Sequence, residues 1–216
     1  MMTPYLSDTV ICFDLDDTLY KEIDYLKSAY IAVAKFVGHP EAVPLMMDWY
    51  YSGENVFEKM IDSYGLSVSV KDCLQLYRNH QPNISLGKGI KDNLLALKEN
   101  GAKLGIITDG RSNTQRAKIN ALKLNDVFDV VIISEESGSE KPGMGNFLAV
   151  MNQYPTRDSF MYVGDNPAKD FYAPNELGWI TYCVKDDGRN IHKQDFSLPS
   201  EYLPKYTIDS IGDFFV

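Results

Sequence analysis

The chain alternates between short apolar runs and longer segments whose apolar residues recur at helical spacing. Strands that are buried on both faces of a parallel sheet are short, nearly continuous apolar runs. Five such runs occur, at residues 9–13, 103–107, 127–133, 159–163 and 179–184. Apolar positions three or four apart predict helices at residues 88–100, 112–124 and 146–154. Because strands and helices alternate, we expect a doubly wound α/β fold with a parallel sheet.

The alternation stops between residues 21 and 85, where helical spacing continues without a strand-like run. Two helical stripes end at Gly38 and Gly65, and glycine is the residue that most often follows a helix. The segment from Ser69 to Asp72 has the pattern of a capping box ahead of one more helix. A helical block of this length is too long for an ordinary connection between a strand and its helix.

The sequence therefore predicts two structural parts. An inserted α-helical subdomain would cover residues 21–85, and an α/β core domain would combine residues 1–20 with residues 86–216. The stretch 186–216 matches no functional motif, and we expect it to pack along the edge of the sheet.

Composition narrows the classes of partner and compartment. The formal net charge is −9 and no basic stripe occurs, so we expect no nucleic-acid partner. Cys12, Cys73 and Cys183 lie far apart, without the spacing of a zinc site or a disulfide framework. No apolar run of membrane length and no secretory leader pattern is present. We expect a cytoplasmic protein with no membrane partner, either a monomer or a homodimer.

The clearest functional signal is a pair of carboxylates directly after the first apolar run. Asp14 and Asp16 follow the segment that ends at Phe13. Two carboxylates beside a buried strand lose water and repel each other, so a fold keeps them only at an energetic cost. An acidic pair taken alone is weak evidence of function, because such pairs often only cap a helix or face solvent.

Other strand ends supply groups that fit the same chemistry. In an open parallel sheet, ligands bind beyond the carboxyl ends of the strands. Thr108 follows the second predicted strand, Lys141 follows the third and Asp165 follows the fourth. Carboxylates, a hydroxyl and a lysine at one sheet edge match the needs of metal-assisted phosphoryl transfer. The acidic cluster requires a cation, because carboxylates alone would repel a phosphate dianion.

In order, spacing and strand context, these residues resemble the four motifs of the haloacid dehalogenase-like hydrolase superfamily, phosphatase branch. The matching positions, in motif order, are Asp14-x-Asp16-x-Thr18, Thr108, Lys141 and Gly164-Asp165-x4-Asp170. The resemblance extends from about residue 9 to about residue 178. It implies a Rossmann-like core, with the helical insertion standing where the C1 cap of subfamily I belongs.

The resemblance also implies a role for each matching residue. Asp14 would be the nucleophile that attacks phosphorus. Asp16 would protonate the leaving oxygen and later deprotonate the attacking water. Mg²⁺ would bind the Asp14 carboxylate, the Asp16 backbone carbonyl and Asp165. The phosphate-binding residues would be Thr108, Asp109 and Lys141.

Several neighbouring residues have a structural alternative to a direct role. Asp170 would orient Lys141 or a water rather than bind the metal itself. Asn166 would orient metal-bound water or simply form the turn before Pro167. Asp17 and Asp109 also suit turn positions. The candidate substrate contacts are Tyr20, Lys21 and Arg111, and we expect no catalytic role for the three histidines.

We therefore expect a Mg²⁺-dependent phosphatase that hydrolyses a small phosphomonoester through an aspartyl-phosphate on Asp14. A phosphomutase remains an alternative, because it differs only in shielding that intermediate from water. A dehalogenase is a second alternative, although it would not need the acid/base carboxylate of Asp16. A catalytically silent binding module on the same scaffold is the third.

Overall fold

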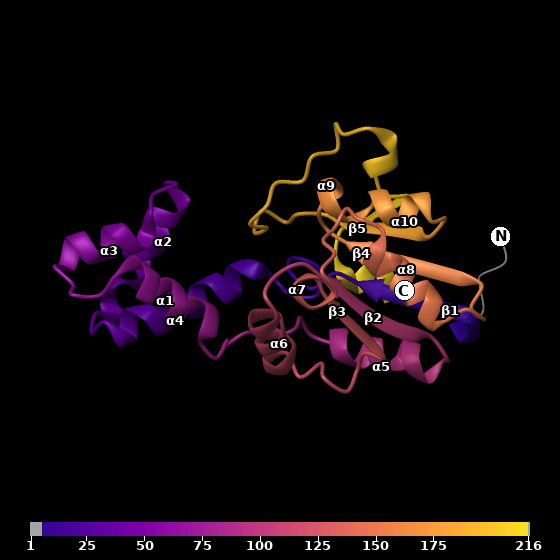
Figure 1. The fold of residues 1–216 in the computed structure, drawn as a ribbon, viewed down its shortest axis with the longest axis horizontal. Helices are drawn as coiled ribbons and strands as arrows, with labels where there is room; N and C mark the ends of the chain where they lie inside the picture. Colours follow the sequence, from indigo (N-terminus) through magenta and orange to yellow (C-terminus); the bar gives the residue numbers. More distant parts are fainter. Residues whose placement is uncertain (1–5, 216) are drawn as a thin grey trace. The chain divides into compact units, whose positions relative to one another are not determined.

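Six parallel strands form one sheet in the computed structural model, which describes residues 6–215, with the strand order β3-β2-β1-β4-β5-β6 (Figure 1). The strands are β1 Thr9–Phe13, β2 Lys103–Thr108, β3 Val130–Ile133, β4 Ser159–Gly164, β5 Ile180–Val184 and β6 Tyr206–Ile208. Every residue of the central strand β1 is buried, as expected for a strand covered on both faces. The predicted doubly wound, Rossmann-like α/β fold is confirmed.

The register of the sheet brings three strand ends together. Phe13 at the end of β1 is level with Ile106 of β2 and with Val163 of β4. Because these strands are parallel, the segments that follow them leave the sheet at the same edge. The residues after β1, β2 and β4 therefore share one place in the fold.

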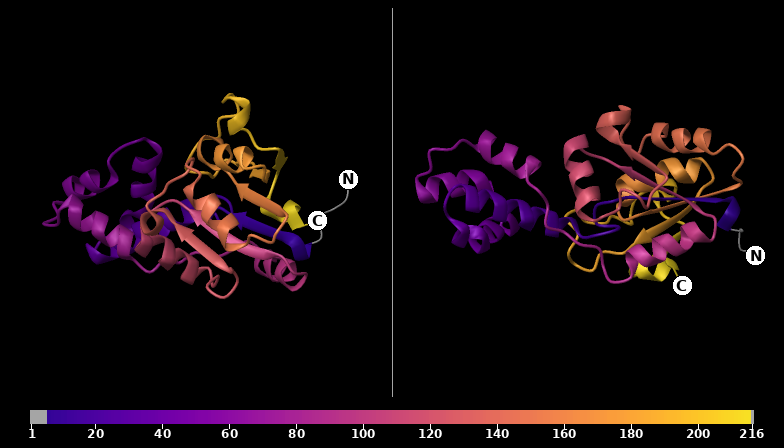
Figure 2. Two further views of the ribbon diagram at one scale, coloured as in Figure 1. Left: turned by 45° about the vertical axis from the view of Figure 1, so that its right-hand side comes forward. Right: turned by 90° about the horizontal axis from the view of Figure 1, so that it is seen from below.

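The side chains of β1 alternate between two apolar layers. Val10 and Cys12 belong to a cluster that also contains Phe147 of helix α8 (Gly145–Gln153). Phe13 points to the other face, where its ring makes edge contacts with Phe128 and Phe214. Phe214 lies in the 3₁₀ helix η4 (Ile211–Phe215), which packs beside helix α5 (Ile90–Glu99) on that face, as Figure 2 shows.

The remaining elements of the core unit are short. They are η1 Leu6–Asp8, α6 Ser112–Ala121, α7 Ser134–Ser137, α9 Pro167–Asp170, α10 Tyr172–Glu176 and η3 Ser200–Tyr202. The three predicted core helices are present, and α6 ends earlier than predicted because Lys123 adopts a left-handed backbone conformation. The C-terminal stretch contributes β6, which pairs with β5 at the sheet edge as expected.

One predicted strand, 127–133, begins too early. The structure places β3 only at Val130–Ile133. Val127 and Phe128 are buried, but they fill the core from the loop before the strand. These two residues are apolar because they pack in the core, and their backbone is not part of a strand. The prediction was therefore wrong for residues 127–129.

A separate compact unit spans Ile23–Ile84, and the other unit runs up to Glu22 and from Ser85 onward. The helical unit contains α1 Glu22–Phe36, η2 Pro40–Ala42, α2 Val43–Tyr51, α3 Val56–Tyr64 and α4 Val70–Asn79. The predicted capping box is present, with Ser69 and Asp72 bonded reciprocally at the start of α4. Helix α2 was not predicted because only Met46 is buried in it, so no apolar stripe marks it.

The described helices include none with the length and apolar character needed to cross a membrane. The expectation that the chain carries no secretory leader concerns residues 1–5 in part, and these lie outside the described residues.

A prediction for the sheet concerns Gly105 of β2. A Cβ atom at this position would lie 2.6 Å from Cys12 Sγ and 2.9 Å from Val130 Cγ1. Both neighbours belong to the packed sheet, so they cannot withdraw without disturbing the core. Gly105→Ala should therefore lower the free energy of unfolding by about 1–3 kcal/mol in urea denaturation.

Gly87→Ala is the matched control, because its added Cβ would approach only Ile90 Cγ1, at an ordinary 3.5 Å. Equal stability of the two variants would show that the sheet relaxes around position 105.

Candidate active site

A pocket of about 200 Å³ lies at the carboxyl edge of the sheet, and all of its lining residues belong to the core unit. The predicted nucleophile, acid/base, phosphate-binding and metal residues all line it. Pockets for drug-sized ligands measure about 300–1,000 Å³. This pocket is therefore sized for a small group, such as a phosphoryl group and its ion.

The loop after β1 presents Asp14 to this pocket. The Asp14 N–H donates to the Val163 carbonyl at 2.8 Å and so extends the pairing of β1 with β4 by one residue. Asp17 adopts a left-handed backbone, φ 57°, that turns the chain away from the sheet. Its carboxylate accepts the N–H groups of Glu22 and Ile191, both at 2.9 Å. Asp17 therefore holds the loop, in agreement with its predicted turn role.

Lys141 is buried at the centre of the site. Its Nζ donates to Asp14 Oδ1 at 2.7 Å, to Asp170 Oδ1 at 2.7 Å and to the Tyr162 hydroxyl at 3.0 Å. All three N–H donors of the ammonium group thus have acceptors, which is what a buried charge needs. The backbone N–H of Lys141 donates to Asp109 Oδ1 at 3.1 Å, which fixes the loop that carries the lysine.

Asp170 holds the fourth strand end in place. Its Oδ2 accepts the backbone N–H groups of Asp165 and Asn166, at 3.0 and 2.8 Å, while Oδ1 accepts from Lys141. These contacts support the interpretation that Asp170 orients Lys141 and the loop. Gly164 is required beside it, because an added Cβ would lie 2.6 Å from Asp170 Oδ2.

Three buried carboxylates could hold a metal ion. Oxygen atoms of Asp14, Asp165 and Asp170 lie within 4.8 Å of one another. Carboxylate oxygens are the ligands that Mg²⁺ prefers. Asp170 is held by the Lys141 ammonium and two backbone N–H groups, whereas Asp165 accepts from the neutral side chains of Thr18 and Asn190. Asp14 and Asp165 are therefore the side chains best placed to serve as ligands.

The protonation equilibria of the site also favour a cation. Burial raises the pKa of Asp14 to about 7; the attraction of Lys141 works against this rise, and repulsion from Asp170 adds to it. Burial likewise raises the pKa of Asp165 well above its usual range, with repulsion from Asp170 and Asp14 adding to the effect. A divalent ion would remove this excess of negative charge, so the donor set fits the implied magnesium.

Asp16 has a different environment from Asp14. Burial acts to raise its pKa, but the charge of Lys118 and hydrogen bonds from Lys118, Tyr20 and Gln115 outweigh burial and leave the pKa below its usual value. Lys118 Nζ donates to both Asp16 oxygens, at 2.7 and 2.8 Å. Asp16 is therefore an anion with its carboxylate held, and its backbone carbonyl is the group that a metal could use.

The other predicted site residues are spread more widely. Asn166 lines the pocket and caps α9, where its Oδ1 accepts the Ala168 N–H at 3.1 Å. Asp109 also lines the pocket and pairs with Lys169 at 3.3 Å. None of the three candidate substrate contacts is among the residues that line the pocket.

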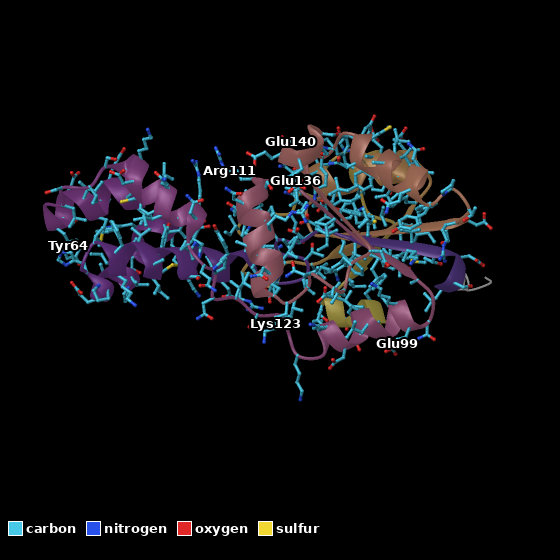
Figure 3. All side chains as sticks on the ribbon, turned by 60° about the horizontal axis from the view of Figure 1, so that its bottom comes forward. Tyr64, Glu99, Arg111, Lys123, Glu136 and Glu140 are labelled. Carbon is cyan, nitrogen blue, oxygen red and sulfur yellow. The ribbon has the colours of Figure 1, made fainter. Side chains whose placement is uncertain are left out.

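Those three contacts have other partners or positions. The Tyr20 hydroxyl donates to Asp16 Oδ1, and Lys21 Nζ donates to Asn190 Oδ1 at 2.7 Å. Arg111 stands exposed just before the first turn of α6 (Figure 3). Their contact with a substrate stays a prediction.

A loop near the C-terminus reaches the site, although no motif in it indicated a function. Asn190 Nδ2 donates to Asp165 Oδ2 at 3.0 Å, and Gln194 Nε2 donates to the Asp165 carbonyl at 2.7 Å. His192, to which the sequence assigned no role, lines the pocket. These residues lie outside the four motifs in the sequence and form no motif of their own. Sequence reasoning therefore could not identify them.

Comparisons with known proteins agree with this geometry. The family model described as haloacid dehalogenase-like hydrolase matches residues 11–184. The chain is 29% identical to the glyceraldehyde 3-phosphate phosphatase of Methanocaldococcus jannaschii, over 94% of this chain and 93% of that protein. It is 27% identical to the ribulose-1,5-bisphosphate 5-phosphatase of Halopiger xanaduensis, over 95% and 97% of the two chains.

Among solved structures, the chain is similar to the Bacillus subtilis protein YfnB, described as a HAD-hydrolase bound to magnesium. The TM-score is 0.71 at 20% identity, and the match covers 96% of each chain. At this identity, the likeness supports the shared fold.

A prediction for the site concerns its central charge. Lys141→Met would leave the buried Asp14 and Asp170 carboxylates without their cation. Removing one partner of a buried ion pair costs about 3–5 kcal/mol. We expect a loss of this size in urea unfolding at neutral pH in metal-free buffer.

Lys169→Met is the control, because Lys169 is half exposed in its 3.3 Å pair with Asp109. That variant should lose no more than about 1 kcal/mol. A similarly small loss in Lys141→Met would mean that the site does not depend on a buried lysine.

Proposed function

Because this chain belongs to the haloacid dehalogenase-like hydrolases, we propose that it is a magnesium-dependent phosphatase of a small phosphomonoester. The observation that carries the proposal is the environment of Asp14. Its carboxylate lines a small pocket and accepts a hydrogen bond from Lys141 through Oδ1. No described side chain donates to Asp14 Oδ2, which is therefore the oxygen available for attack.

The first half of the proposed reaction transfers the phosphoryl group to Asp14. Oδ2 attacks phosphorus, and the bond from phosphorus to the ester oxygen breaks. That oxygen takes a proton from Asp16, whose resting carboxylate must first gain this proton from solvent when the substrate binds. Lys141 offsets the charge on the nucleophile, and the Thr108 hydroxyl donates to a phosphoryl oxygen. Asp14 then carries the phosphoryl group as an acyl phosphate.

The second half restores the enzyme. Asp16 takes a proton from a water molecule, whose oxygen attacks phosphorus and displaces Asp14 Oδ2. The products are inorganic phosphate and the free Asp14 carboxylate. Magnesium, held by Asp14, Asp165 and the Asp16 carbonyl, would supply positive charge to the phosphoryl oxygens.

The relatives support a small phosphorylated metabolite as the substrate, since the two described above are named for phosphorylated sugars. The geometry favours a phosphatase over a dehalogenase, because Asp16 is held beside the nucleophile and lines the same pocket. We also propose that the helical unit serves as the family's cap and that the enzyme works in the cytoplasm.

Asp14→Asn tests the nucleophile. The substitution keeps the size of the side chain and removes its negative charge, so folding should persist while turnover falls at least about 10³-fold. Release of p-nitrophenol from p-nitrophenyl phosphate in magnesium buffer is the measurement. Asp126→Asn, an exposed position, should keep wild-type activity. Comparable turnover by Asp14→Asn and wild type would refute the role of Asp14.

Asp165→Ala tests the metal site. Loss of one carboxylate ligand should raise the magnesium concentration needed for half-maximal activity at least about tenfold. Isothermal titration calorimetry with magnesium alone should show the same weakening without any turnover. An unchanged binding isotherm would show that Asp165 is not a ligand, whatever the activity.

A further inference from the structure

Helix α6 carries two polar side chains that are buried without matching any motif. Gln115 is 1% exposed and Lys118 is 3% exposed. They stand three residues apart, so they share one face of the helix. Burying an amide and an ammonium group is costly unless each finds partners. Both find the same partner, the predicted acid/base residue.

The Gln115 amide bridges two groups of the active site. Its Nε2 donates to Asp16 Oδ2 at 2.9 Å and to Thr108 Oγ1 at 2.6 Å. The amide orientation follows from chemistry, because the opposite one would set its carbonyl oxygen against an ionised carboxylate. One nitrogen with two hydrogens therefore ties the acid/base carboxylate to the phosphate-binding hydroxyl.

This bridge sets the direction of the Thr108 hydroxyl. Since the Thr108 oxygen accepts from Gln115, its own hydrogen remains available as a donor. Thr108 lines the pocket, so that hydrogen can point to a phosphoryl oxygen. Without Gln115, the hydroxyl would lose this donor and could turn about its C–O bond.

Lys118 completes the restraint on Asp16. Its Nζ binds both carboxylate oxygens and lies 3.7 Å from Glu22 Oε1. The Tyr20 hydroxyl adds a donor to Oδ1. The Asp16 carboxylate therefore receives four hydrogen bonds from three side chains, which leaves it little freedom to rotate.

We propose that Gln115 and Lys118 are positioning residues, which hold the Asp16 carboxylate and the Thr108 hydroxyl in one fixed arrangement relative to the phosphoryl group. They act through Asp16 and Thr108 rather than on the substrate. This inference rests on the proposed phosphatase function and adds two residues to its machinery.

The proposal has a consequence that a purely structural role lacks. A proton from Asp16 matters most when the leaving oxygen is strongly basic and least when it is a stabilised nitrophenolate. Misplacing Asp16 should therefore make the rate depend more steeply on the basicity of the leaving group. The value of kcat/KM reports this step, because it includes events only up to the first phosphoryl transfer.

The test compares p-nitrophenyl phosphate with phenyl phosphate, two substrates of similar shape. In Gln115→Met and Lys118→Met, kcat/KM for phenyl phosphate should fall at least about 10²-fold, and for p-nitrophenyl phosphate less than about tenfold. Asn113→Met, an exposed amide on the same helix, should leave both values unchanged. Equal losses for the two substrates, or no loss, would overturn the proposal.

Two further variants test the proposal even if the methionine variants do not fold. Gln115→Asn retains the amide but is one methylene too short to bridge both partners, and it serves if the methionine variants do not fold. It should show the same unequal loss, and Lys118→Arg, which keeps the cation, should recover part of the phenyl phosphate rate. Wild-type protein inactive on both esters would refute the phosphatase itself, whereas active wild type with equal losses in the variants refutes only the positioning role.

Discussion

The compensation of buried negative charge at one sheet edge is the constraint on which this structure depends. Parallel strands deliver Asp14, Asp165 and Asp170 to the same place, where burial and mutual repulsion oppose their ionised forms. Lys141 supplies a buried cation that touches both Asp14 and Asp170. The remaining imbalance of negative charge is what makes the site suited to a divalent ion.

Each of two buried lysines pairs with a different carboxylate: Lys141 with Asp14, and Lys118 with Asp16. Burial keeps the pKa of Asp14 raised despite the charge of Lys141, whereas Lys118 and its neighbours outweigh burial and lower the pKa of Asp16. The two carboxyls therefore differ in how readily they ionise. The resting Asp16 is an anion, the form that accepts a proton from water. In the proposed reaction, the phosphate dianion would raise the pKa of Asp16 and so favour the protonated form that the first step needs.

The sequence predicted the parts of the site that follow strands. Asp14, Thr108 and Asp165 could be placed together because apolar runs mark strands and parallel strands share an edge. Gln115 and Lys118 carried a weaker signal, two polar residues on the inner face of a helix, which is visible only when that face is known. Asn190 carried none, because its contact with Asp165 spans 25 residues and depends on how an irregular loop folds. The short strand β6 was not predicted either, because its residues are mostly exposed and form no apolar run.

The pocket is large enough for the reacting phosphoryl group but not for a whole substrate molecule. Every residue that lines it belongs to the core unit, and its volume of about 200 Å³ accommodates the phosphoryl group that all monoesters share. A pocket that holds only the phosphoryl group does not contact the alcohol to which that group is bound. Side chains outside the pocket must therefore contact the rest of the substrate. The two relatives, at 29% and 27% identity to this chain, are accordingly named for different phosphorylated sugars.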